Sequence, residues 1–237
     1  MELLTSDEGR SRIGGMAFVH LLPDGKTRMK TALLIVLLML PAALAAQTGG
    51  DELVNIKELI PDIVLDIKYN TTDNFVTTYS GAPQKLYTTD ECLVARVVAD
   101  RLILIQDSLR NRGLGLKLFD AYRPRAVQWL MWETLPPEYQ SFVANPATGS
   151  HHNRGAAVDI TLVDRASGAE LNMGTPFDFF GPEAAITYTG FPPDVLANRY
   201  LLRDMMYWQG FTIYEAEWWH YQHSAATSFP LVDYQLK

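Results

Sequence analysis

The sequence predicts a single α+β domain, in which a few antiparallel strands carry helices packed on one side. Three observations support this class. Helix and strand signals alternate without the regular βαβ rhythm of a doubly wound sheet. The chain has no internal repeat, low-complexity tract or long linker that would divide it. Its content of 48% hydrophobic and 20% charged residues is ordinary for a globular protein.

The first strong helix signal follows Thr89 and Asp90, whose side-chain oxygens can cap a helix. Apolar residues then recur at three- and four-residue intervals as far as Leu109, and Gly113 follows as a stop. The spacing therefore predicts a helix that opens near Thr89 or Asp90 and runs through Leu109.

The remaining elements follow in order. Strand composition is found at 114–119, and a helix at 125–133 ends before a pair of prolines. Small and β-branched residues predict a strand at 155–162. A helix at 194–208 lies between a proline pair and Gly210, and the last strand-like stretches are 211–214 and 218–222.

The amino-terminal region has the pattern of a secretory signal peptide. Basic residues precede a uniformly apolar run at 32–40, and Pro41 and a small-residue run at 42–46 follow it. The apolar run is well short of the ~20 residues that span a bilayer, which argues against a membrane anchor. We therefore expect a signal at about 29–46, one domain at 47–237, and export to the periplasm or the cell exterior without a stable anchor.

Met29 stands where such a signal would naturally begin. We hypothesise that translation starts there and that the residues before it are a non-native extension. A peptide from residues 1–28 in cell extracts would contradict this.

Charge and cysteine content exclude other classes. The net charge is −7 and no dense Lys/Arg stripe is present, so a nucleic-acid partner is not expected. Cys92 is the only cysteine, which excludes an internal disulfide. It lies within the first predicted helix and far in sequence from every histidine, so we interpret it as a core residue rather than a nucleophile.

The segment SHHNRGAAVD, residues 150–159, can contribute metal ligands. A His and an Asp seven residues apart can reach one metal if the chain turns back between them. Gly155 supplies the freedom for that turn, and the alanines after it leave room for close packing. The doublet His151-His152 is ambiguous by one residue, and the spacing to Gly155 and Asp159 favours His152. Taken alone, a His near an Asp is more often a polar surface pair.

The segment EWWHY, residues 217–221, can complete such a site. A catalytic zinc takes three protein ligands and leaves a position for water, with a carboxylate nearby to move protons. Glu217 and His220 can divide the roles of base and ligand. Residues three apart on a regular strand point to opposite faces, so we predict a bend around Trp218 that directs both side chains into one cleft. Core packing is expected for at least one of the two tryptophans.

The segment DAYRP, residues 120–124, ends a predicted strand. An isolated arginine is usually a solvated charge. Arg123 is fixed by the following proline just after a buried strand, which suits it to stabilise a developing oxyanion.

In combination these segments resemble the signatures of the D-Ala-D-Ala zinc metallopeptidases. Within that family the chain is most similar to the VanX-type D-alanyl-D-alanine dipeptidases. The closer similarity rests on DIKYNTTDNF (66–75), MGTPFD (173–178) and NRYLLR (198–203), and it extends from about residue 53 to the carboxyl end. The resemblance implies a hedgehog-like fold with one Zn²⁺ in a central cleft, and hydrolysis of D-Ala-D-Ala to two D-alanines in cell-wall peptide metabolism.

The resemblance also implies a role for each matching residue. The zinc ligands would be His152, Asp159 and His220. Glu217 would be the general base and acid, and Arg123 would stabilise the tetrahedral intermediate. For the substrate, Ser150 would hold the carboxylate, while Tyr69 and Asp178 would surround the free amino group. Asn70 departs from the small residue more usual after this tyrosine. His223 is expected at the surface, outside the site.

Two alternatives remain at this point. One is a D,D-carboxypeptidase or endopeptidase that trims longer peptidoglycan stems; the segment 66–75, which dipeptidases use to roof a small cavity, argues against it. The other is an inactive, zinc-containing wall-binding module. The presence of the base and the arginine together with all three ligands argues against that.

Overall fold

The computed structural model describes residues 49–236, which all belong to one compact unit. The predicted signal peptide, the hypothesis about Met29 and the domain boundary at 46/47 lie outside these residues. No helix within the described part of the chain is long and apolar enough to cross a membrane.

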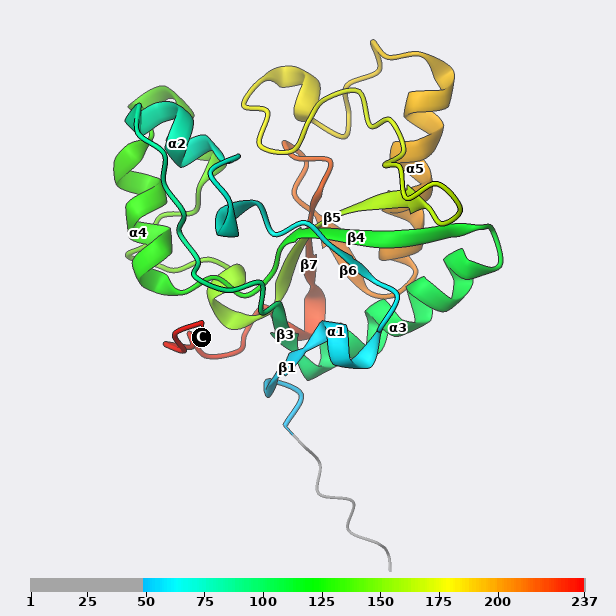
Figure 1. Cartoon of the computed structure of the whole chain (residues 1–237), viewed down its shortest axis with the longest axis horizontal. Helices are drawn as coiled ribbons and strands as arrows, with labels where there is room; N and C mark the ends of the chain where they lie inside the picture. Colours follow the sequence, from blue (N-terminus) through cyan, green and yellow to red (C-terminus); the bar gives the residue numbers. More distant parts are fainter. Residues whose placement is uncertain (1–48, 237) are drawn as a thin grey trace, which may run out of the picture. The chain divides into compact units, whose positions relative to one another are not determined.

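A five-stranded sheet forms the centre of the fold (Figure 1). In spatial order its strands are β2 (Val64–Leu65), β4 (Leu114–Asp120), β5 (Ala157–Asp164), β7 (His220–His223) and β6 (Phe211–Ile213). The predicted antiparallel pairing holds from β4 to β6, whereas the short edge strand β2 runs parallel to β4. A separate antiparallel pair joins β1 (Leu53–Asn55) to β3 (Leu93–Ala95).

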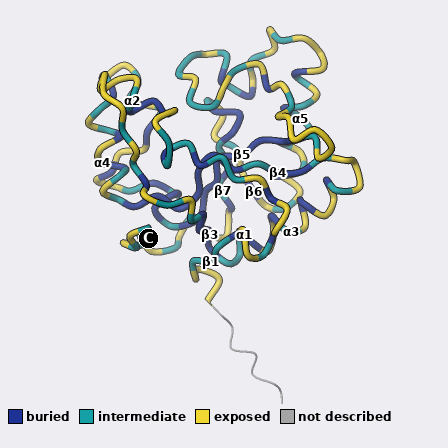
Figure 2. The backbone as a smooth tube through the Cα atoms, in the orientation of Figure 1, coloured by how far each residue is buried: buried dark blue, intermediate teal, exposed yellow. Residues whose placement is uncertain are grey.

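Five α-helices surround these strands. They are α1 (Ile56–Leu59), α2 (Phe75–Ser80), α3 (Arg96–Arg110), α4 (Arg125–Thr134) and α5 (Pro193–Tyr207). Helix α3 packs against β4, α5 packs against β5 and β6, and α2 packs against α4. The central strands are buried along most of their length, whereas the outer helices each expose one side (Figure 2).

The predicted helix from Thr89 or Asp90 is wrong at its beginning. Residues 93–95 pair with β1 as a strand, and α3 begins only at Arg96. The hydroxyl of Thr89 accepts the amide of Glu91 in a local turn rather than capping a helix. The first amides of α3 bond instead to the carbonyls of Glu52 and Gly50, so a tertiary contact replaces a side-chain cap. Cys92 therefore lies outside any helix, but its expected place in the core is confirmed.

The last hairpin positions one wall of the site. Along β7, His220 and Gln222 line the central cavity, whereas Tyr221 between them lies against Arg203, Asp204 and other residues of α5 on the opposite face. His223 points to the same side as Tyr221, is buried, and packs edge-on against Phe211 at 5.0 Å between ring centroids. The expectation that His223 lies at the surface is therefore wrong, because strand alternation turns it inward.

Candidate metal and active site

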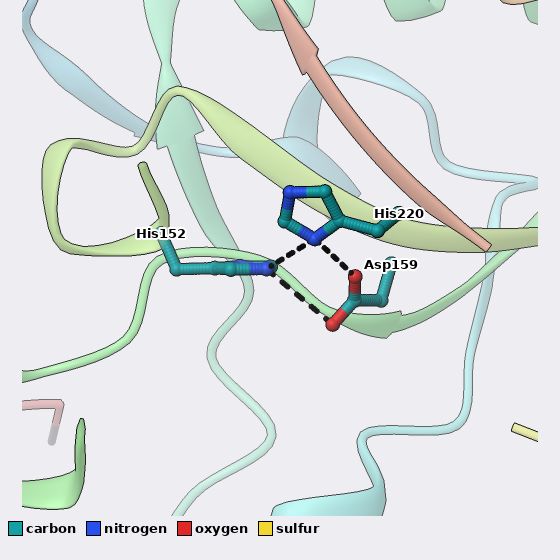
Figure 3. Close-up of side chains that lie close together, drawn as sticks. All are labelled: His152, Asp159 and His220. Atoms are coloured by element: carbon teal, nitrogen blue, oxygen red, sulfur yellow. Dashed lines mark hydrogen bonds and ion pairs between the residues drawn. The ribbon is translucent and has the colours of Figure 1, made fainter. Parts of the chain in front are cut away.

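Three side chains from separate segments converge on one point at the centre of the fold (Figure 3). His152 lies on a 3₁₀ turn, Asp159 on β5 and His220 at the start of β7. His220 Nδ1 lies 3.0 Å from Asp159 Oδ1 and 3.2 Å from His152 Nε2, and His152 Nε2 lies 3.4 Å from Asp159 Oδ2. These ligand atoms all lie within 4.8 Å of one another, close enough to share a single ion.

Local backbone geometry explains this convergence. Strand pairing places Asp159 directly opposite His220. Gly155 ends the 3₁₀ turn with φ +63°, a conformation that favours glycine. A Cβ at this position would lie 2.8 Å from the backbone nitrogen of Ala95, so the turn also needs the missing side chain. The predicted glycine turn between His152 and Asp159 is therefore present.

The donor set fits Zn²⁺. The Nδ1 of His152 lies 2.6 Å from the carbonyl of Ala121, so Nδ1 carries the proton and Nε2 presents its lone pair toward Asp159 and His220. Burial lowers the pKa of His220, which favours the neutral, ligating imidazole although the adjacent Asp159 opposes the shift. Two imidazole nitrogens and one carboxylate, with space left for water, are a typical catalytic zinc set.

The charge balance of the cavity also favours a cation. The buried carboxylates of Asp120, Asp159 and Glu217 and the part-buried carboxylate of Asp178 lie around the cavity, and among the described residues that line it only Arg123 brings a fixed positive charge. Burying carboxylates in such excess is costly unless a cation accompanies them.

Glu217 lies beside the cluster, on a turn between β6 and β7. Its amide bonds to the carbonyl of Tyr214, and its own carbonyl accepts the amide of His220 at 3.3 Å. Glu217 Oε2 lies 4.0 Å from His220 Nδ1, and both side chains line the same cavity. The chain therefore bends here as predicted, through a turn rather than a bulged strand. Because Trp218 and Trp219 are not on a strand, both can be buried, and both are.

The environment of Glu217 suits proton transfer. Burial raises the pKa of this carboxyl well above its usual value, and the negative charges of Asp159 and Asp178 add to the effect. A cation bound by His152, Asp159 and His220 would act in the opposite direction and lower the pKa of Glu217. A carboxyl group whose pKa is raised in this way holds a proton more readily, which suits it to accept a proton and return it.

Arg123 is buried and held on several sides. Its Nε and Nη2 donate to the same oxygen of Asp120 at 2.9 and 2.8 Å, and its Nη1 donates to Gln128 Oε1 at 2.9 Å. The hydroxyl of Tyr87 donates to the other oxygen of Asp120 at 2.9 Å. The guanidinium also lies over the ring of Tyr69. Each Nη carries a second N–H group that these bonds do not use. The guanidinium lines the cavity, and its Nη2 lies 3.7 Å from Asp159 Oδ2.

Tyr69 and Asp178 form another part of the cavity wall. The hydroxyl of Tyr69 donates to Asp178 Oδ2 at 2.9 Å. Asp178 is the only non-glycine residue with positive φ, at 57°, among residues 49–236. Such strain is held by the surrounding structure and is concentrated at functional positions. Burial, and then the charge of Asp159, raises the pKa of Asp178.

All eight residues singled out from the sequence line one cavity of about 320 Å³. Ser150 lies next to the metal cluster, and its Oγ accepts the amide of His152 at 3.2 Å. Apolar side chains close the cavity, among them Phe75 from the roofing segment and Phe180. The lining also includes Tyr214 and Trp219 from the turn before β7, and Gln222 from β7 itself.

The residues that hold these side chains in place were not expected from the sequence. Asp120 and Gln128 fix the guanidinium of Arg123, and Tyr87 donates a hydrogen bond to the other oxygen of Asp120. The side chain of Asn153 bonds to the backbones of two site residues, Ser150 and Arg123. Asp120 and Asn153 lie inside the quoted segments, so a search for buried polar partners within those segments could have found them. Tyr87 and Gln128 carry no such signal.

Comparison with known proteins agrees with this geometry. A family model described as D-Ala-D-Ala dipeptidase matches residues 50–235. The D-alanyl-D-alanine dipeptidase of Escherichia coli K12 is 33% identical over 182 residues, which cover 76% of this chain and 89% of the relative. That of Enterococcus faecium is 32% identical over 180 residues, covering 69% and 87%. The resemblance inferred from the sequence is confirmed: the chain belongs to the D-Ala-D-Ala dipeptidase family of metallopeptidases.

Proposed function

We propose that this protein hydrolyses the free dipeptide D-Ala-D-Ala to two D-alanines, with one Zn²⁺ held by His152, Asp159 and His220. One observation carries the proposal. The three ligands, Glu217 and Arg123 line one cavity of about 320 Å³, at the small end of the range for ligand pockets. A cavity of this size suits a dipeptide better than a pentapeptide stem.

Each residue has a place in the reaction. When bound, Zn²⁺ supplies a Lewis acid beside the peptide carbonyl and lowers the pKa of water at the site. Glu217 takes a proton from the attacking water and then gives it to the leaving amine. The free N–H groups of Arg123 stabilise the negative charge that develops on the carbonyl oxygen.

The two charged ends of the dipeptide, its ammonium and its carboxylate, are recognised by separate groups. The carboxylate of Asp178 pairs with the substrate ammonium, and Tyr69 fixes that carboxylate through its hydroxyl. The hydroxyl of Ser150 already accepts the amide of His152, which leaves its proton free to donate to the substrate carboxylate. A substrate with a blocked amino group would lose the pair with Asp178 and meet the wall that this residue forms.

The test is release of D-alanine by the purified protein from three substrates: D-Ala-D-Ala, its N-acetyl derivative and a pentapeptide stem. We expect turnover of the free dipeptide, at least about tenfold weaker turnover of the acetylated one, as expected for loss of a charged hydrogen bond, and none of the stem. A chelator should abolish turnover and Zn²⁺ should restore it. Cleavage of the stem but not of the dipeptide would instead identify a carboxypeptidase or endopeptidase. Bound zinc without any turnover would identify a wall-binding module.

We also propose that the protein acts outside the cytoplasm, on D-Ala-D-Ala derived from the cell wall. The signal-like pattern at about 29–46 supports this. The amino terminus of the protein recovered from an extracytoplasmic fraction should lie near residue 47. Active enzyme found only in the cytoplasm, with residues 29–46 still attached, would refute the proposal.

A further inference from the structure

The side chain of Asn153 connects the backbones of two site residues, Ser150 and Arg123. Asn153 is fully buried, one position after the ligand His152. Its Oδ1 accepts the amide of Ser150 at 2.7 Å, and its Nδ2 donates to the carbonyl of Arg123 at 2.7 Å. The amide of Arg123 in turn donates to the carbonyl of His152 at 3.2 Å. One carboxamide therefore fixes the distance between the loop that carries Ser150 and His152 and the end of β4 that carries Arg123.

Residues 229–234, which we term the C-terminal strap, hold Asn153 from outside. The amide of Val232 donates to the carbonyl of Asn153 at 2.9 Å. The side chain of Leu231 rests on Gly149, where φ is +80° and an added Cβ would meet its methyl group. Arg154 donates to the carbonyl of Phe229. The red carboxyl-terminal end accordingly lies beside the yellow-green loop in Figure 1.

The strap also contacts the segment that carries Arg123. The hydroxyl of Tyr122, the residue before Arg123, lies 3.0 Å from the carbonyl of Val232. The same hydroxyl accepts the amide of Tyr234 at 2.8 Å. The strap therefore contacts both segments that Asn153 connects, which are the loop that carries His152 and the end of β4 that leads to Arg123. None of the strap residues lines the cavity itself.

We infer that Asn153, clamped by the C-terminal strap, is a positioning residue that sets the spacing between the zinc ligand His152, Ser150 and Arg123. The inference rests on the proposed function for its catalytic consequence, but its consequence for metal binding stands separately. Productive geometry tolerates displacements of only about half an ångström. Loss of the carboxamide leaves the Ser150 amide and the Arg123 carbonyl without partners in a buried place, so both chain segments must shift.

The decisive experiment compares Asn153→Ala, Tyr122→Phe and the exposed control Asn111→Ala in the otherwise intact protein. Three properties are measured for each variant. They are the zinc affinity by chelator competition, the kcat and KM for D-Ala-D-Ala, and the thermal unfolding temperature without metal. For Asn153→Ala we expect zinc to bind about tenfold more weakly or worse, the usual effect of losing a partner of a metal ligand. Its kcat should fall because Arg123 moves, and its KM should rise because Ser150 moves. Tyr122→Phe should change the same quantities less, and the control should change none.

The outcomes separate positioning from simple stabilisation. If Asn153→Ala unfolds at lower temperature but, while folded, binds zinc and turns over substrate within twofold of the parent, the inference is overturned. If Asn153→Ala does not fold, the zinc affinity and the turnover of Tyr122→Phe decide. Values within twofold of the parent protein would then overturn the inference. If the parent binds zinc but does not cleave the dipeptide, the proposed function fails, while the zinc affinities still decide whether Asn153 positions the ligand loop.

Discussion

Replacing Glu217 with glutamine should lower kcat for D-Ala-D-Ala by about 10²- to 10⁴-fold, the range that general acid–base catalysis supplies. Glutamine has nearly the same shape but cannot accept a proton from water or return one to the leaving amine. Zinc affinity should stay close to that of the parent protein, because the three ligands keep their places and Glu217 Oε2 lies 4.0 Å from His220 Nδ1. Steady-state kinetics and chelator competition on the same preparation test both statements.

Glu215 offers a matched control on the same turn. Its side chain is exposed and it does not line the cavity. Glu215→Gln removes the same charge two residues away, so it should retain the activity of the parent protein. Near-parental turnover by the Glu217 variant, or an equal loss in both variants, would contradict the role of Glu217 as the proton-transfer group.

Much of the candidate site could be predicted because its residues lie in short segments with local constraints. Gly155 permits the turn that returns the chain from His152 to Asp159, and that freedom is visible in the sequence. The spacing of Glu217 and His220 requires a bend if both are to act together, and the structure provides one. The strand before Arg123 and the helix after it were also predicted within one residue of their observed ends.

The rest of the structure depends on contacts that local patterns do not encode. The beginning of α3 is set by carbonyls of Gly50 and Glu52, some forty residues earlier in the chain. Whether His223 faces inward depends on the register of β7 with β5 and β6, and a shift of one residue would reverse it. Gln128 is buried in the first turn of α4 and bonds to Arg123 from there, a contact that no periodicity reveals.

Replacing Arg123 with alanine should affect both activity and stability. Loss of an oxyanion-stabilising group lowers kcat/KM by about 10²- to 10³-fold. The same change leaves Asp120 buried without its cation, since both of its bonds from Arg123 disappear and only that from Tyr87 remains. Breaking a buried ion pair from one side costs about 3–5 kcal/mol of unfolding free energy. Kinetics and urea unfolding measure the two effects, and the exposed Arg112→Ala should show neither.

A double variant separates the two consequences. In Arg123→Met/Asp120→Asn both charges are gone, and Tyr87 can still donate to the amide oxygen at position 120. Most of the lost stability should therefore return, because replacing both members of a buried pair is far less costly than removing one. Activity should not return, because methionine has no N–H to offer the developing charge. If the double variant instead recovered both stability and turnover, the effect of Arg123 on catalysis would be only that of holding the fold. Recovery of stability without recovery of turnover would show that the guanidinium acts directly on the reacting carbonyl.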